Sequence, residues 1–470
     1  MRRLALVTFL ALGLVVAGVW WLKLEPSPPS IEIAAGGDVI GRQAAWDVVV
    51  RANGRPALRW VDARLRAGGQ TYPLFKEEFP ADGPGVSEKR VRVEADLGAA
   101  GVVEGPAQLE VTADTYAWHL FGGSRGGVAT RDVAIDLSPP RLELLTTQHN
   151  MRLGGASMVL FRVSDDATVA GVRVGNYEFP AVRGYFADPA IALAIFAVPQ
   201  DLDTATVPVV HAADAAGNAQ SVSVPVLIKG RTFPERHLAI DDGFLQRKVP
   251  EILGKVGQPV PVDLKQGYLT VNRDVRKQSE ERLRAMTATS ADHPLWTGVF
   301  HRQSNAAPMS AFADRRSYEY QGETIDRQTH LGYDLASLKR APVEAAQAGV
   351  VVFADYLGIY GDTVVIDHGL GVFSLYGHLS TIAVTQGQTV QAGETVGQTG
   401  ETGLAGGDHL HFSIMLRGTH IDPVEWWDPL WMRDHIAARL ASFPPAAAPA
   451  EPAPAPVPPS EPVANGQAQP

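Results

Sequence analysis

The sequence predicts a mainly β protein made of several domains, and three observations support this fold class. Its 470 residues exceed the roughly 100–200 that one ordinary domain occupies. Its hydrophobic fraction of 45% and charged fraction of 20% are typical of a globular chain with buried cores. Between residues 31 and 229, short apolar or alternating runs are broken by Gly, Asp and Pro, a rhythm that antiparallel sheets produce.

The N-terminal segment has the length of a membrane span. Two arginines precede nineteen uncharged, mostly apolar residues, 4–22, a run longer than the roughly 7–15 apolar residues of a secretory signal. Trp20 and Trp21 stand where interfacial aromatic residues are expected. We therefore expect residues 1–25 to be an uncleaved, single-pass transmembrane anchor in the inner membrane, with the body in the periplasm or cell envelope. A cleaved signal peptide is the alternative.

Two β-sandwich domains are expected after a short proline-rich spacer. The SPP sequence at residues 138–140 prevents a strand from continuing, and it sets a boundary between segments 31–138 and 139–229. In the second segment, the sequence DAAGN at residues 214–218 precedes the last expected strand. It resembles the turn before the final strand of bacterial immunoglobulin-like domains, so we expect immunoglobulin-like sandwiches.

The second half of the chain is expected to hold a connector, a third domain and a tail. Residues 230–300 are rich in charged and helix-forming residues and should form a partly helical, solvated connector, in which Asn272 is a candidate N-cap for a helix ending at Met286. Residues 301–440 return to glycine-rich strands and close with a helix that carries tryptophans. The Pro/Ala-rich tail, 441–470, lacks the apolar surface for a core and is expected to be disordered.

Charge and cysteine content narrow the chemistry. Lys and Arg number 41 against 51 Asp and Glu, a formal charge of -10, which argues against nucleic acid as a partner. The chain has no cysteine, which excludes disulfides, thiolate nucleophiles and iron–sulfur clusters. Any metal must therefore be held by histidine and carboxylate side chains.

Histidines cluster in the third domain, where eight of the 13 lie between His301 and His435. The sequence HLGYD places His330 and Asp334 four residues apart, and HLH places His409 and His411 on one face of an expected strand. A catalytic zinc site takes three such ligands and leaves a fourth position open. Spacing alone does not say which histidine of the HLH pair is the ligand.

A further histidine lies between these motifs, His378 in the sequence LYGHL, and hydrolysis by a metal needs a base and an oxyanion donor beside the ligands. Residues 308–423 contain, in order, PMSAFADRRSY, HLGYD, DHG, LYGHLS, DHLHFSI and IDP. This order resembles the lysostaphin-type, LytM-like zinc metallopeptidases, which cut peptide bonds in peptidoglycan.

The resemblance implies a site and a reaction. It implies an antiparallel β-sheet metallopeptidase domain in which His330, Asp334 and His411 bind one Zn²⁺, while His378 and His409 flank the catalytic water. One of those two histidines would act as the base and the other would stabilise the oxyanion. The expected substrates are stem or cross-link peptides of peptidoglycan, and the expected activity is that of a zinc metalloendopeptidase.

Two other functions remain open. Some proteins with this fold are non-catalytic activators or scaffolds of cell-wall hydrolases, and in those the metal ligands are typically missing, whereas all five positions are filled in this sequence. The β-domains could alternatively bind cell-wall protein partners. The connector is also a candidate cover for the substrate groove.

Overall fold

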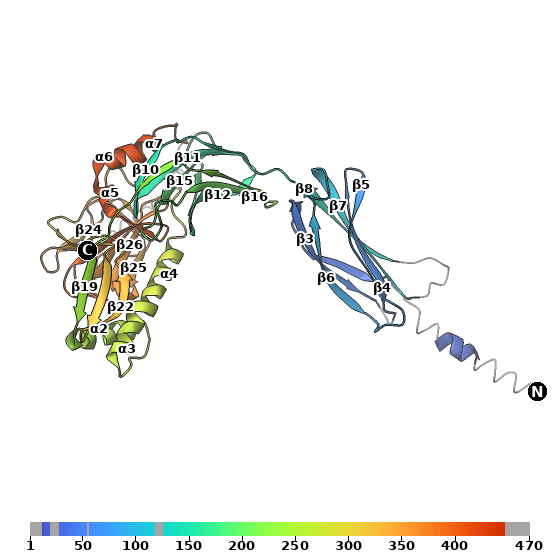
Figure 1. The fold of residues 1–470 in the computed structure, drawn as a ribbon, viewed down its shortest axis with the longest axis horizontal. Coiled ribbons are helices and arrows are strands. Elements are labelled where there is room, and N and C mark those ends of the chain that lie inside the picture. The colour runs from blue at the N-terminus through green and yellow to red at the C-terminus, as the bar shows by residue number, and fades with distance from the viewer. Residues whose placement is uncertain (1–11, 19–27, 54–55, 118–125, 447–470) are drawn as a thin grey trace, which may run out of the picture.

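The computed structural model describes residues 12–18, 28–53, 56–117 and 126–446. The prediction of a mainly β chain is confirmed, because strands far outnumber helices within these residues. The strands from β3 (Gln43–Arg51) to β8 (Gly127–Ile135) form an elongated unit that lies apart from the remaining sheets and helices (Figure 1).

The structure contradicts the predicted single-pass location in the inner membrane. Among the described residues, no helix is long and apolar enough to cross a membrane. Residues 1–11 and 19–25 of the predicted anchor lie outside the described residues, as does most of the predicted tail, 447–470.

The first β unit consists of two sheets that share one core. Burial alternates along β3, where Trp46, Val48 and Val50 are at most 1% exposed, because successive side chains of a strand point to opposite faces. They pack with Leu65 and Leu109 from the other sheet. The sheets are β1 (Ser30–Ala35), β3 (Gln43–Arg51) and β6 (Glu88–Asp96), and β2 (Val39–Ile40), β8 (Gly127–Ile135), β7 (Gly105–Thr115), β4 (Leu58–Ala67) and β5 (Gln70–Glu78).

The second β unit shares its core with the C-terminal domain. Every residue of β15 is buried, which requires cover on both faces of that strand. Its apolar side chains belong to one cluster that continues into Phe412 and Trp426. The strands are β9 (Leu142–Leu144), β10 (His149–Arg152), β11 (Ala156–Val163), β12 (Ala167–Val174), β13 (Tyr177–Pro180), β14 (Val182–Arg183), β15 (Ile191–Ala197), β16 (Val209–Asp214), β17 (Ala219–Ser223) and β18 (Val226–Lys229).

The connector is packed rather than solvated. Its strand β19 (Glu235–Ile240) pairs in parallel with β21 (Arg315–Tyr320), which pairs with β22 (Glu323–Thr329). Helices α2 (Asp242–Lys255), α3 (Leu264–Thr270) and α4 (Arg276–Met286) bury Ile252 and Leu283 against the large sheet. These apolar contacts with a distant part of the chain correct the expectation of a solvated segment.

The expected helix start at Asn272 is also wrong. Asn272 is fully buried within the π-helical turn η1 (Val271–Val275), which joins α3 to α4. Asp263 is the N-cap, and its side chain accepts hydrogen bonds from the backbone N–H groups of Lys265 and Gln266. Asn272 instead donates to Asp326 on β22 at 2.8 Å, so its polarity serves a tertiary contact.

The C-terminal domain is built on an eight-stranded sheet in the order β20-β23-β31-β27-β26-β25-β29, with β32 beside β31. Its strands are β20 (Ala307–Ser310), β23 (Tyr333–Ala336), β25 (Gly349–Tyr356), β26 (Asp362–Asp367), β27 (Val372–Leu379), β29 (Thr389–Val390), β31 (Leu410–Leu416) and β32 (Thr419–Ile421). A smaller sheet holds β24 (Pro342–Glu344), β30 (Thr395–Gln398) and β28 (Thr381–Ile382), and the helical turns are η2 (Gly358–Tyr360), α5 (Pro423–Trp427), α6 (Pro429–Met432), η3 (Arg433–Ala437) and α7 (Ala438–Leu440).

This sheet separates two cores, because its central strands are buried on both faces. On β31, Phe412 and Ile414 belong to the core shared with the second β unit, whereas Met415 belongs to the core under the connector helices. On β27, Val372 and Phe373 divide in the same way. Polar residues whose side chains point to the same face as Met415 and Phe373 therefore lie on the side of the connector.

The half-buried carboxyl of Glu425 joins the second β unit to the C-terminal domain. Glu425 accepts a hydrogen bond from the backbone N–H of Ala156 at 3.0 Å, and any side chain at Gly155 would lie within 2.8 Å of its two oxygens. Burial raises the pKa of Glu425 to about 7, and the charge of Asp422 adds to this. In the folded chain the neutral form of Glu425 is therefore favoured below about pH 7.

The protonation state of Glu425 should affect how the stability of the protein depends on pH. The pKa of Glu425 in the folded chain lies above the ordinary 4.5. The contribution of Glu425 to stability is therefore complete below about pH 4.5 and is lost as pH rises through about 7. The loss in the free energy of unfolding is at most about 3 kcal/mol. We expect Glu425→Gln, which keeps the acceptor, to unfold at a higher temperature than the unmodified protein at pH 8.5 and at a similar temperature at pH 5. Thermal unfolding curves with parallel pH dependence for both proteins would contradict this.

Candidate metal centre

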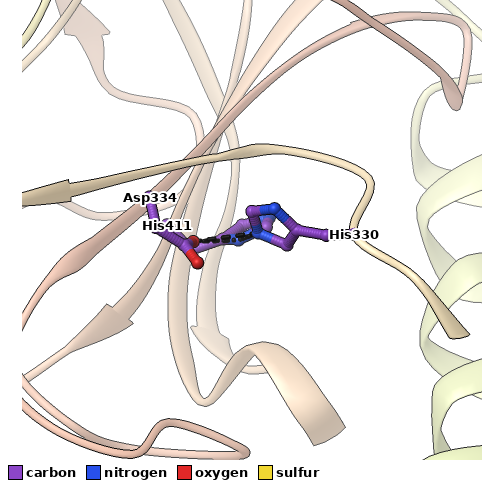
Figure 2. A group of neighbouring side chains, drawn as sticks. All are labelled: His330, Asp334 and His411. Carbon is purple, nitrogen blue, oxygen red and sulfur yellow. Dashed lines mark hydrogen bonds and ion pairs between the residues drawn. The ribbon is translucent and has the colours of Figure 1, made fainter. Parts of the chain in front are cut away.

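Strand register brings Asp334 and His411 together. Asp334 on β23 lies directly opposite His411 on β31, so both side chains point to the connector face of the sheet. His330 stands in the turn that leads into β23. That turn passes close to His411, since a Cβ at Gly332 would lie 2.4 Å from two atoms of the His411 ring. Glycine at this position therefore lets the three side chains converge, as Figure 2 shows.

The three donor atoms form a compact triangle. Nε2 of His330 and Nδ1 of His411 lie 2.9 and 3.0 Å from Oδ1 of Asp334, and the two nitrogens are 3.0 Å apart. All three residues are buried. Tetrahedral zinc with bonds of about 2.0–2.1 Å needs ligand atoms about 3.3 Å apart. The group therefore fits such an ion with a small outward movement.

Hydrogen bonds fix the protonation of three imidazoles around this triangle. Nδ1 of His330 lies 3.0 Å from the carbonyl oxygen of Ala311, and Nδ1 of His378 and of His409 lie 2.8 Å from backbone carbonyl oxygens. A carbonyl only accepts, so each Nδ1 carries a proton, and in the neutral form of each ring Nε2 keeps a lone pair. In His330 that lone pair faces the donor triangle, as a metal ligand requires.

The structure brings the two other predicted histidines to the same place. The rings of His378 and His409 have centroids 4.9 Å apart, and His378 lies 5.7 Å from His411. Nε2 of His409 is 3.5 Å from Oδ1 of Asp334. Each of the five predicted residues thus stands in one buried cluster, although the division of roles between them stays a prediction.

His378 has an unusual backbone. Its φ is 62°, a conformation that non-glycine residues rarely adopt and that costs of order 1–3 kcal/mol. It occupies the end of β27, where the strand departs from regular pairing. Such strain persists where the surrounding structure fixes a side chain, and the ring of His378 lies beside that of His409.

The cluster perturbs the pKa values of its members in opposite directions. Burial raises the pKa of Asp334, but the charge and hydrogen bond of His330 and the bonds of His409 and His411 outweigh it and hold that pKa well below 3.8. Burial lowers the pKa of His378 well below 6.5, and neighbouring histidines add to this. Burial lowers the pKa of His409 too, yet Asp334 overcomes this and raises it. A buried carboxylate surrounded by imidazoles is thus kept ionised, as a cation ligand must be.

Sequence reasoning missed Arg316. Its Nη2 donates to Oδ2 of Asp334 at 2.9 Å, which leaves Oδ1 for the histidines. It is 17% exposed and sits on β21, where Tyr318 shares its face and is 7% exposed. The alternation of this strand could have identified Arg316, rather than Arg315, as the inward residue.

A second polar chain supports His411 from the connector side. Ser413, two residues along β31, bonds Nδ1 of His420 at 2.9 Å, and Nε2 of His420 bonds Glu280 of α4 at 3.1 Å. Tyr360 donates to the same carboxylate at 2.6 Å, and its ring lies 5.2 Å from that of His411. The connector helix therefore helps to position a candidate ligand.

The five residues open onto a cavity of ≈ 480 Å³, a size that suits a short peptide. Its far wall comes from the connector, including Leu238, Phe244 and Tyr268. His368 lies elsewhere: its two ring nitrogens bond Ala348 O at 2.8 Å and Ser374 Oγ at 2.7 Å, so neither is available to a ligand.

Comparison with known proteins identifies the part of the chain that carries this cluster. Residues 328–423 match the model of Peptidase family M23. These residues form an M23 domain. The predicted relationship to LytM-like peptidases is thereby confirmed. The match begins just before the turn that holds His330 and ends at Pro423, so it includes the donor triangle but neither the connector nor Arg316.

Relatives of the M23 domain include proteins named as peptidases and proteins named as activators of other hydrolases. The DD-carboxypeptidase/endopeptidase Mpg of Neisseria meningitidis serogroup B is 41% identical over 95 residues, 20% of this chain and 22% of the relative. The murein hydrolase activator EnvC of Escherichia coli is 35% identical over 95 residues, 20% of this chain and 23% of the relative. The chain thus spans less than a quarter of these relatives.

One solved structure spans more of the chain. The putative peptidase M23 from Pseudomonas aeruginosa covers 58% of this chain and 92% of its own, with 21% identity and a TM-score of 0.36.

Proposed function

We propose that the M23 domain is a zinc-dependent endopeptidase that hydrolyses peptide cross-links of peptidoglycan and so remodels the cell wall. The observation that carries this proposal is the buried triangle of His330, Asp334 and His411, whose donor atoms lie 2.9–3.0 Å apart. The endopeptidase name of a relative at 41% identity supports the type of reaction.

The residues of the triangle would hold the ion, and the two neighbouring histidines would move protons. When bound, zinc supplies a Lewis acid that polarises a carbonyl and lowers the pKa of water to about 7. In their neutral forms His378 and His409 each keep an Nε2 lone pair. One would accept the proton of the attacking water, and the other, carrying on Nε2 a proton taken up from solvent before the reaction, would donate a hydrogen bond to the developing oxyanion. The accepted proton then passes to the leaving amine.

Arg316 acts through Asp334 in this proposal. By donating to Oδ2, the guanidinium fixes the rotation of the carboxylate so that Oδ1 faces both imidazole ligands. Partners of this kind typically alter metal affinity or activity 10- to 100-fold when removed.

A second candidate is an activator of other cell-wall hydrolases, and the observation that favours it is the 35% identity to a protein named as a murein hydrolase activator. The complete set of five side chains weighs against it, because an activator has no need of a buried, strained imidazole such as His378.

Incubation of the purified protein with peptidoglycan sacculi tests the proposal. We expect new amine termini to appear with about one zinc per chain, to stop on chelation and to return when zinc is added. Protein that binds zinc, releases no amine and yet increases cleavage by an added wall hydrolase would establish the activator instead.

A further inference from the structure

The cavity over the candidate metal centre is lined by basic residues of the connector and of β21. Four arginines line it, Arg236, Arg247, Arg276 and Arg316, against two carboxylates, Asp241 and Asp334. The chain as a whole carries a formal charge of -10. Arginine is therefore concentrated where a substrate would lie. None of these arginines belongs to residues 328–423, so this feature comes from the chain outside the M23 match.

Two of the arginines already have acidic partners. Arg316 bonds Asp334 at 2.9 Å, and Nε of Arg236 lies 3.0 Å from the buried carboxylate of Asp314. Their charges are offset within the protein, so they add little attraction for a ligand.

The other two are not paired with acids. Among the described residues, neither Arg247 nor Arg276 has a carboxylate within 4.0 Å. Asn272 orients Arg276, accepting from its Nε at 3.1 Å through the backbone oxygen and from its Nη2 at 2.7 Å through the side chain. The remaining nitrogen of Arg276, Nη1, has no hydrogen-bond partner among the described residues. Glu280, one turn along α4, bonds His420 and Tyr360 instead.

Such an arrangement is suited to an anion. The guanidinium of Arg276, held by neutral acceptors, is suited to bind a carboxylate by charge-assisted hydrogen bonds, which are stronger than neutral ones. Arg247 is exposed and adds a second positive charge to the same cavity. Wall peptides differ in this respect, since some carry free carboxylates beside their peptide bonds whereas glycine bridges or amidated stems do not.

Resting on the proposed function, we propose that Arg247 and Arg276 bind a free carboxylate of the substrate, so that the M23 domain selects acidic peptides over neutral ones. The connector would then be part of the binding site. Lys277, next to Arg276 on α4, does not line the cavity and is 75% exposed, so it provides a matched control for charge.

The test uses two synthetic cross-linked peptides of the same sequence, one with its carboxylates free and one amidated. Dissociation constants are measured by calorimetry on the full chain with chelator present, which prevents turnover and removes any pull of a metal ion on the carboxylate. We expect the acidic peptide to bind about 10- to 100-fold tighter, and this preference to fall to about twofold in the Arg247→Gln/Arg276→Gln protein while Lys277→Gln retains it.

Cleavage of the same peptides by zinc-loaded protein separates the two proposals. A preference expressed in KM, and lost in the double variant, supports the inference. Equal dissociation constants for the two peptides in the unmodified protein would overturn it, even if both are cleaved. Selective binding without cleavage of either peptide would overturn the proposed endopeptidase and leave the carboxylate site standing.

Discussion

The His330→Ala protein is expected to purify without stoichiometric zinc and to release no measurable amine from sacculi. Nε2 of His330 supplies one corner of the donor triangle, 2.9 Å from Asp334 and 3.0 Å from His411. Its removal leaves two protein ligands, fewer than the three that catalytic zinc sites use. We expect metal affinity to fall by more than the roughly 10- to 100-fold that loss of a supporting partner costs.

Metal content after dialysis, measured by mass spectrometry, checks this expectation. His293→Ala is the control, because the His293 side chain is exposed and, within the part of the chain that the structure describes, bonds only its neighbour Asp292. Circular dichroism must show that both variants are folded. A His330→Ala protein that keeps one zinc per chain and full cleavage would remove the triangle from the metal site.

Only part of the candidate site has a geometry that is local enough to predict from the residues themselves. HLH fixes two imidazoles on one strand face, and the strand period of two is a property of the backbone. The opposition of Asp334 and His411 follows from sheet register. Register is not local, and only the resemblance to a known family made the convergence of the motifs predictable.

The parts that could not be predicted depend on contacts between distant segments. Asn272 has the composition of a helix cap, but its partner Asp326 lies on another strand, so a tertiary contact overrides local preference. The expected solvated connector failed for the same reason, since Leu283 meets the sheet only after folding. One local signal was available for the shared core: the uninterrupted run IALAIFA in β15 is typical of a strand buried on both faces.

Replacing His378 should separate chemistry from metal binding. Its Nδ1 bonds a backbone carbonyl and its ring lies beside His409, outside the donor triangle. We therefore expect His378→Ala to retain zinc while turnover falls by about two to four powers of ten, the usual contribution of a positioned acid or base. Metal content and the rate of amine release, measured on the same preparation, check both parts. Zinc loss equal to that of His330→Ala would reverse the assigned roles.

The backbone at this position adds a second measurement. Alanine and glycine both delete the imidazole, but only glycine adopts a φ of 62° without steric cost. His378→Gly should therefore be more stable than His378→Ala by about 1 kcal/mol, opposite to the usual order within strands, with equally low turnover in both. If alanine proves the more stable variant, the positive φ is not a strained feature. The two variants lack the same imidazole and differ only in backbone strain at position 378. A difference in turnover between them would therefore mean that this strain affects the reaction rate.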